Sequence, residues 1–242
     1  MPHSPQPIVA IGDGSEAALN AAWRAVRIAQ NCGVPVHLLD ARSSSSSTSQ
    51  AAGLLVTHVE DGCRPSQWFL GTRIEQLVRK FAVPVLVVKQ PASARYRRVV
   101  VGVKLDLQAS ELVAGARMLA PRARFDVVHV LGTSCEYRLR LADAPEAAVR
   151  AHRTRTHSDA YRRMNDLIAA GCGHEANVIT PRLVVGSAPD RLLEMGRVSR
   201  AGLIVLGKRP RHWLADLFLD RGIGRRMLAE APNDVLLVPA GC

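Results

Sequence analysis

A strand followed by a basic loop and then a helix is predicted for residues 203–226, LIVLGKRPRHWLADLFLDRGIGRR. Phosphate groups often bind at such places in α/β proteins, because a helix N-terminus presents free N–H groups and the positive end of its dipole. Guanidinium groups also pair well with phosphate oxygens. Pro210 argues against a phosphate cradle, because it lacks an N–H and adds bulk. The side chains of Lys208, Arg209, Arg211 and Arg221 could bind phosphate, and the alternative that we favour is a solvated basic loop.

Motifs of common enzymes do not occur in the sequence, which has no GK[ST] phosphate loop, no GxSxG and no HExxH. The histidines are spread singly, and His129, inside the apolar run VVHV, is interpreted as a core histidine with satisfied hydrogen bonds. The five cysteines form no CxxC pair, so neither a disulfide framework nor a zinc site is expected. We therefore expect no catalytic residues, no metal and no enzymatic activity.

Length and composition are those of a globular protein, with 242 residues of which 48% are hydrophobic and 22% are charged. No apolar run approaches the ~18 residues that a membrane span needs. The N-terminal segment MPHSPQPIVAIGDG lacks the ordered features of a signal peptide. We expect a cytoplasmic protein without a membrane partner.

Positive charge is concentrated after residue 96. Lys and Arg outnumber Asp and Glu by 9 to 6 before that point and by 23 to 15 after it. A basic surface attracts nucleotides, nucleic acids and anionic lipids without selecting among them. One alternative function is therefore a nucleic-acid or anionic-partner module. It would use the arginines of one helix, namely Arg150, Arg153, Arg155, Arg162 and Arg163. Aromatic residues, on which the bases of single strands stack, make up only 4% of the chain, which argues against this function.

The chain also contains an internal repeat. AGLLVTH at 52–58 returns as AGLIVLG at 201–207, and VPVLVVK at 83–89 returns as NDVLLVP at 233–239. Such repetition indicates two copies of one structural unit. We predict two domains, residues 1–92 and 97–242, which pair with each other through VPVLVV and DVLLVP.

The second copy alternates apolar runs with helix-period segments, which predicts a doubly wound parallel sheet. Gly171 is expected to end a long helix, Pro181 to mark an edge strand or a bulge, and Ser187 with Asp190 to form a capping box. The predicted strands are 98–103, 125–132, 176–186, 202–207 and 234–240, and the predicted helices are 108–120, 144–171, 187–198 and 223–231.

The first copy is shorter. Its opening strand, first helix and second strand at 34–41 are followed by the serine run RSSSSSTSQ at 42–50, where the second copy has a helix and its third strand. A serine run buries too little apolar surface to offset its ordering entropy. We therefore expect a flexible bridge, and we expect the strands at 8–12 and 53–58 to lie side by side and parallel.

The segments IVAIGDGSEAALNAA, GSAPDRLLEMGRVSRAGLIVLGKR and RRMLAEAPNDVLLVP resemble the universal stress protein family. The resemblance covers nearly the whole chain, as a tandem pair with the first copy truncated. It implies the adenine nucleotide α-hydrolase-like fold, with strand order 3-2-1-4-5 in each copy and without helix 2 and strand 3 in the first. It also implies a regulatory protein of the stress response that binds ATP or AMP, forms dimers through its last strand and acts on a protein partner that the sequence does not identify.

ATP-binding members of that family resemble the pattern G-x-x-G, nine residues, G-[ST] after the fourth strand, with an aspartate after the first strand. In the first copy the aspartate is Asp13, within Asp13-Gly14-Ser15, and Gly71-Thr72 matches the final pair. His58 and Asp61 stand where the two leading glycines would be, and Asp61 would repel a phosphate. The alternative is that Thr72 is only an N-cap and that Asp13 and Ser15 only cap the first helix.

In the second copy the resemblance places Lys104 at the aspartate position, with Asp106 or Ser110 as alternatives if the turn is longer. Gly207 is retained, Pro210 replaces the second glycine, and the final pair falls on Arg221 and Gly222. The alternative is that this segment is only a solvated basic loop. In that case we expect its apolar side chains to pack between the two copies, namely those of Trp213, Leu217 and Phe218. We expect degenerate nucleotide sites, of which Asp13, Gly14, Ser15, Gly71 and Thr72 form the better one.

Overall fold

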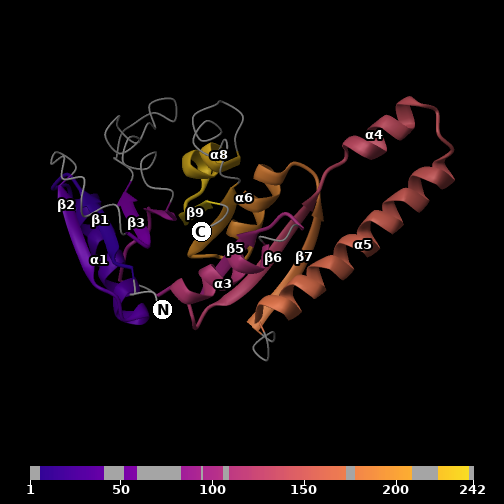
Figure 1. The fold of residues 1–242 in the computed structure, drawn as a ribbon. Helices are drawn as coiled ribbons and strands as arrows, with labels where there is room; N and C mark the ends of the chain where they lie inside the picture. Colours follow the sequence, from indigo (N-terminus) through magenta and orange to yellow (C-terminus); the bar gives the residue numbers. More distant parts are fainter. Residues whose placement is uncertain are drawn as a thin grey trace.

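The fold is taken from a computed structural model, which describes residues 6–40, 52–58, 83–93, 95–105, 109–172, 178–208 and 223–239. These residues form an α/β structure around a nine-stranded sheet of order β2-β1-β3-β4-β9-β8-β5-β6-β7 (Figure 1). All neighbouring strands are parallel except β4 and β9. The predicted α/β fold with a mainly parallel sheet is confirmed.

One half of the sheet comes from the start of the chain. Its elements are β1 (Ile8–Gly12), α1 (Glu16–Cys32), β2 (Val36–Asp40), β3 (Leu54–His58) and β4 (Val85–Val88). β1 lies between β2 and β3, and Ile8 pairs in parallel with Leu54 of β3. The predicted parallel pairing of strands 8–12 and 53–58 is therefore confirmed, and β2 lies at one edge of the sheet.

The other half has the order β7-β6-β5-β8-β9, which is 3-2-1-4-5 in chain order. β4 and β9 join the two halves as antiparallel neighbours, with Leu86 opposite Leu236. The division into two domains at residues 92 and 97 stays a prediction. The elements are β5 (Arg98–Gly102), α3 (Ala109–Leu119), β6 (Arg124–Leu131), α4 (Ser134–Leu141), α5 (Glu146–Cys172), β7 (Ile179–Val185), α6 (Ala188–Val198), β8 (Leu203–Lys208), α8 (Ile223–Glu230) and β9 (Asp234–Pro239).

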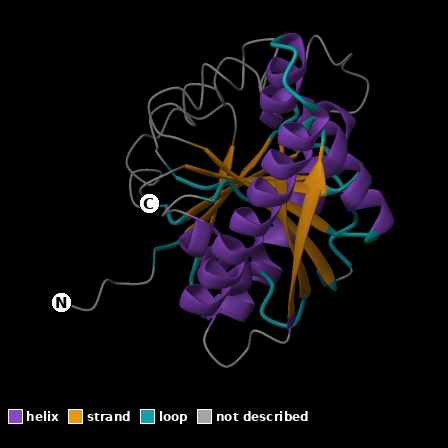
Figure 2. Ribbon diagram, turned by 90° about the vertical axis from the view of Figure 1, so that its right-hand side faces the viewer, coloured by secondary structure: helices purple, strands orange, loops and turns teal. Residues whose placement is uncertain are grey.

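Helices cover both faces of the sheet (Figure 2). On one face α1, α3 and α5 pack through residues such as Ile28, Val113 and Met164. On the other face α6 and α8 pack through Leu192 and Met227. The central strands are apolar on both sides because both sides are covered, as expected for a parallel sheet. Of the helices among the described residues, none combines the length and apolarity that a membrane span requires.

A buried polar network ties the two halves together at the segment that follows β4. Asp234, which is fully buried, accepts hydrogen bonds from the backbone N–H groups of Lys89 and Gln90, both at 2.8 Å, and from the Tyr96 hydroxyl at 2.5 Å. Its Oδ2 also lies 3.3 Å from Nε of the buried Arg24. The segment that follows β4 is thus held in place by contacts with β9 and α1.

Lys89 and Tyr96 of this network have shifted pKa values. Lys89 Nζ donates to carbonyl oxygens at the C-terminal end of α8, including that of Ala231 at 2.7 Å. Burial lowers the pKa of Lys89 to about 8, although the Asp234 charge opposes this effect. Burial and the neighbouring Asp234 charge raise the pKa of Tyr96 well above its usual value. The network therefore keeps the Tyr96 hydroxyl protonated as a hydrogen-bond donor.

Three local details differ from the sequence predictions or were missed by them. The long helix continues through Gly171 to Cys172, so the prediction that Gly171 ends it is wrong. Ser187 stands at the N-cap of α6 but makes no side-chain cap bond, and its side chain instead interacts with Asp190, so the predicted capping box does not form. The sequence did not reveal α4, which has no buried residue and extends with the start of α5 beyond the sheet (Figure 1).

The edge position predicted for Pro181 is confirmed, whereas the prediction for His129 holds only in part. β7, which contains Pro181, is an edge strand. The ring of His129 is half-buried, and its Nδ1 lies 2.9 Å from the carbonyl oxygen of Val103. Nδ1 of the ring is therefore satisfied within the fold, but the residue is only partly buried and does not belong to the core.

Candidate functional site

The turn between β1 and α1 brings together Asp13, Gly14 and Ser15. Ser15 is the N-cap of α1, and its Oγ accepts a hydrogen bond from Ala18 N–H at 3.1 Å. Its own N–H donates to Asp13 Oδ1 at 2.9 Å. Gly14 has a φ of 89°, in the left-handed region that favours glycine. The sequence DGS folds into this turn because it supplies a cap, a glycine and an acceptor in the required order.

His58 lies beside this turn, at the carboxyl end of β3. Its Nε2 is 3.3 Å from Ser15 Oγ and 3.6 Å from Asp13 Oδ2. The residue is 7% exposed, and its Nδ1 is buried with no hydrogen-bond partner in the described part of the chain. The tautomer with the proton on Nε2 donates to Asp13 or Ser15 and leaves Nδ1 as a buried acceptor. His58 therefore positions the turn from behind.

Asp13 is the member of this cluster that a ligand can reach, since 29% of its side chain is exposed. Hydrogen bonds from the side chain and backbone of Ser15 lower the pKa of Asp13. Burial opposes this effect, and the nearby His58 contributes a weaker lowering. The group is a carboxylate at neutral pH. Its negative charge lies at the N-terminus of α1, where it interacts favourably with the positive end of the helix dipole. The turn therefore suits hydrogen-bond donors such as a ribose hydroxyl or an amino group better than it suits a phosphate.

A serine, a histidine and an aspartate in contact raise the question of nucleophilic catalysis. In a hydrolase triad the hydroxyl and the carboxylate meet opposite ring nitrogens of the histidine, so that one nitrogen takes the proton while the other is held. Here Ser15 and Asp13 both face Nε2, and Ser15 Oγ is occupied by the helix cap. The geometry is that of a supported turn and not of a triad.

The model of the universal stress protein family matches residues 95–239. This match spans more than half of the chain. The chain belongs to the universal stress protein family. No curated protein shows a significant match to it.

Solved structures of universal stress proteins resemble the whole chain. One from Archaeoglobus fulgidus is 13% identical, with a TM-score of 0.64, over 97% of this chain and 96% of its own. A putative universal stress protein from Pseudomonas aeruginosa is 15% identical, with a TM-score of 0.59, over 97% of this chain and 93% of its own. At these identities the likeness establishes the fold alone, and it agrees with the parallel sheet described above.

In a universal stress protein the second copy's site is expected after β5 and β8. Ile8 pairs with Leu54 in the first half, and Val99 pairs with Leu203 in the second. When the two halves are aligned on these pairs, Lys104 is the residue equivalent to Asp13. In the same alignment Gly207 of β8 is the residue equivalent to His58. Lys104 is exposed, and a Cβ added to Gly207 would come within 3.1 Å of Leu112. A cation thus stands where the first half has its carboxylate.

Lys208 ends β8 and pairs with Pro239 of β9, so its backbone belongs to the sheet. Among the alternatives for the aspartate position, Ser110 lies in the first turn of α3. The other predicted site residues lie outside the described residues, namely Gly71, Thr72, Asp106, Arg209, Arg221 and Gly222, together with the serine run, Asp61, Pro210 and the packing residues Trp213, Leu217 and Phe218.

Sequence reasoning missed the role of His58, which it interpreted only as a substituted loop glycine. The run LLVTH offered one signal, because a polar residue that ends an apolar parallel strand lies at the edge where ligands bind. It also missed Asp234 and Tyr96, which are far apart in the sequence and meet through the folding of the sheet.

Proposed function

We propose that this universal stress protein is a regulatory binding protein without catalytic activity, and that the turn at Asp13 binds the nucleoside part of an adenine nucleotide. One observation carries the proposal. A partly exposed carboxylate, a helix cap and a buried histidine meet at the carboxyl ends of two adjacent parallel strands. Ligands of open α/β sheets bind at those ends.

Charge at the turn predicts which part of the nucleotide matters. Asp13 accepts hydrogen bonds and repels phosphate, and Ser15 Oγ is already an acceptor for the helix backbone. We therefore expect that adenosine binds about as tightly as ATP, with weak affinity. We also expect that the protein carries little or no ATP after purification.

Calorimetric titration of adenosine, AMP and ATP tests the proposal. We expect similar affinities for all three ligands in the wild-type protein and a loss of about tenfold or more in Asp13→Asn, because a hydrogen bond to a charged group is worth about 1.5–3 kcal/mol. Asp143→Asn is the matched control, since Asp143 is exposed and distant in the sequence, and Asn tolerates its φ of 51°.

Three outcomes would contradict the proposal. Adenosine that fails to bind while ATP binds tightly would mean that a phosphate loop dominates. Equal affinities of Asp13→Asn and the wild-type protein would place the nucleotide elsewhere. Hydrolysis of ATP at a rate that follows substitution of Ser15 or His58 would refute the absence of catalysis.

A further inference from the structure

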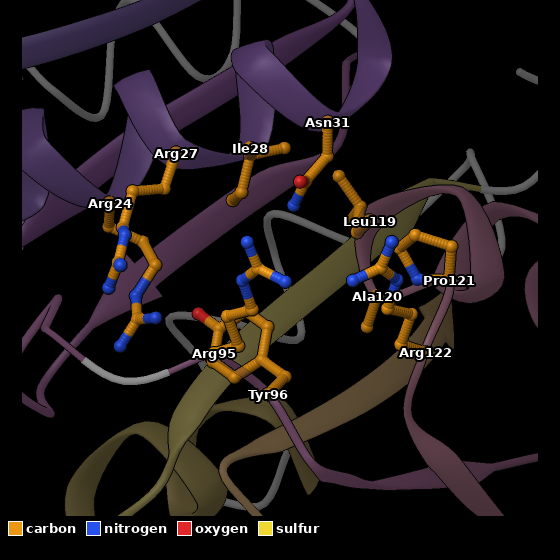
Figure 3. A pocket seen from close by; sticks show the side chains of 10 residues that line it. All are labelled: Arg24, Arg27, Ile28, Asn31, Arg95, Tyr96, Leu119, Ala120, Pro121 and Arg122. Carbon is orange, nitrogen blue, oxygen red and sulfur yellow. The ribbon is translucent and has the colours of Figure 1, made fainter.

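A cavity of about 230 Å³ lies between α1 and the segments that precede β5 and β6. One wall is formed by the second half of α1, another by residues just before β5, and a third by the turn between α3 and β6 (Figure 3). The lining residues are Arg24, Arg27, Ile28, Asn31, Arg95, Tyr96, Leu119, Ala120, Pro121 and Arg122. Four of them carry a positive charge, and of the described residues that line the cavity none is acidic.

The positive charge in this cavity is only partly neutralised. Arg24 is ion-paired with the buried Asp234. Arg27 Nη1 donates to the carbonyl oxygens of Ala92, at 2.6 Å, and Ser93, which are uncharged and leave its charge in place.

The other two arginines of the cavity have no partner among the described residues. Arg95 and Arg122 are exposed, and neither has an ion pair or a hydrogen bond to any described residue. Figure 3 shows their side chains reaching into the space beneath Asn31 of α1. Two guanidinium groups and an amide donor therefore converge on one volume, beside the uncompensated charge of Arg27.

The cavity offers little to a nucleobase. Tyr96 is the only aromatic residue among the described residues that line it, it is 8% exposed, and Arg24 already covers its ring at 4.4 Å from the centroid. The volume lies below the range of roughly 300–1,000 Å³ that is usual for drug-sized ligands. Guanidinium groups pair with phosphate oxygens through parallel N–H donors. We propose that this cavity binds the phosphate groups of a small polyanion of about the size of pyrophosphate.

This site is separate from the turn at Asp13. Asp13 precedes the N-terminus of α1, whereas Arg27 and Asn31 lie near its C-terminus. A helix of 17 residues is about 25 Å long, so one ligand of this size does not reach both places. Binding in the cavity therefore does not depend on the proposed nucleoside site.

Calorimetric titration with pyrophosphate tests the proposal on three proteins: the wild type, Arg95→Gln/Arg122→Gln and the control Arg150→Gln/Arg155→Gln. Both double variants lose the same net charge, and all four arginines are exposed, so the fold is expected to persist and is checked by circular dichroism. We expect the control to bind within about twofold of the wild type. The cavity variant should bind at least about tenfold more weakly, because it loses charge-assisted hydrogen bonds.

Titrations with inorganic phosphate, ATP and adenosine complete the experiment. ATP binding that weakens in the cavity variant would identify the phosphate tail of a nucleotide as a ligand, and ATP binding that is unchanged would identify a free oligophosphate. Adenosine has no phosphate and reports only on the turn at Asp13, so failure there leaves the cavity result intact. The proposal is overturned if the wild-type protein does not bind pyrophosphate at millimolar concentration, or if both double variants weaken binding equally, which would indicate only the net charge.

Discussion

Substitution of Asp234 by Ala should destabilise the protein strongly, because this carboxylate is the centre of the buried network between β4 and β9. The change removes the acceptor for two backbone N–H groups and for the Tyr96 hydroxyl, and it leaves the Arg24 guanidinium without its opposite charge. The side chains of Arg24 and Asp234 are only 4% and 0% exposed. Removal of one partner from a buried ion pair costs about 3–5 kcal/mol. We expect a loss in this range.

Urea denaturation followed by circular dichroism measures the effect, with the free energy of unfolding taken from the midpoint at a constant slope. Asp234→Asn should lie between the wild type and Asp234→Ala, because it keeps an acceptor for the N–H groups but loses the charge. Glu194→Ala is the control. It breaks the exposed pair with Arg191, whose side chains are 44% and 54% exposed, and it should cost below about 1 kcal/mol. A loss below about 1 kcal/mol in Asp234→Ala would refute the argument that this network joins the two halves.

Three further predictions concern pH, the turn and nucleic acid. Between pH values of about 8 and 10.5 the unfolded chain holds a proton on Lys89 that the folded protein has released. The free energy of unfolding, measured by urea denaturation, should therefore rise with pH in this range, and Lys89→Met should flatten the rise. Gly14→Ala should lose about 1–2 kcal/mol of stability in thermal or urea unfolding because of its positive φ, and a neutral result would contradict the left-handed backbone at that position. Fluorescence anisotropy should show weak binding of duplex DNA with little dependence on salt, since two of the five arginines of α5 pair with Glu136 and Asp159, whereas steep weakening from about 50 to 200 mM salt would support a nucleic-acid partner.

Much of the fold could be predicted because local pattern and tertiary context agree. The three valines of the run RVVVG are β-branched and apolar, and they are buried in β5 between neighbouring strands on both sides. DGS predicts a helix start, and Ser15 is the N-cap of α1. Pro181 indicates an edge strand because it cannot donate to a second neighbour.

Other features depend on distant contacts and left no local signal. Gly171 is a strong stop residue by propensity, but α5 continues past it to Cys172. Ser187 and Asp190 have the spacing of a capping box, yet Asp190 is drawn to Arg226 of α8 at 2.6 Å. The cavity at Arg95 and Arg122 arises only where α1 and the turn before β6 approach each other, so no motif could have indicated it.

Nuclear magnetic resonance of the labelled protein during titration with adenosine tests the nucleoside site at Asp13 most directly. We predict that the amide resonances of Gly14 and Ser15 shift in proportion to saturation, because a ligand on Asp13 Oδ2 alters the hydrogen bond from Ser15 N–H to the same carboxylate. The resonances of Arg95 and Tyr96, near the other end of α1, should not move. Shifts confined to Lys104 and Gly207, or no shift at saturating adenosine, would contradict a nucleoside site at this turn.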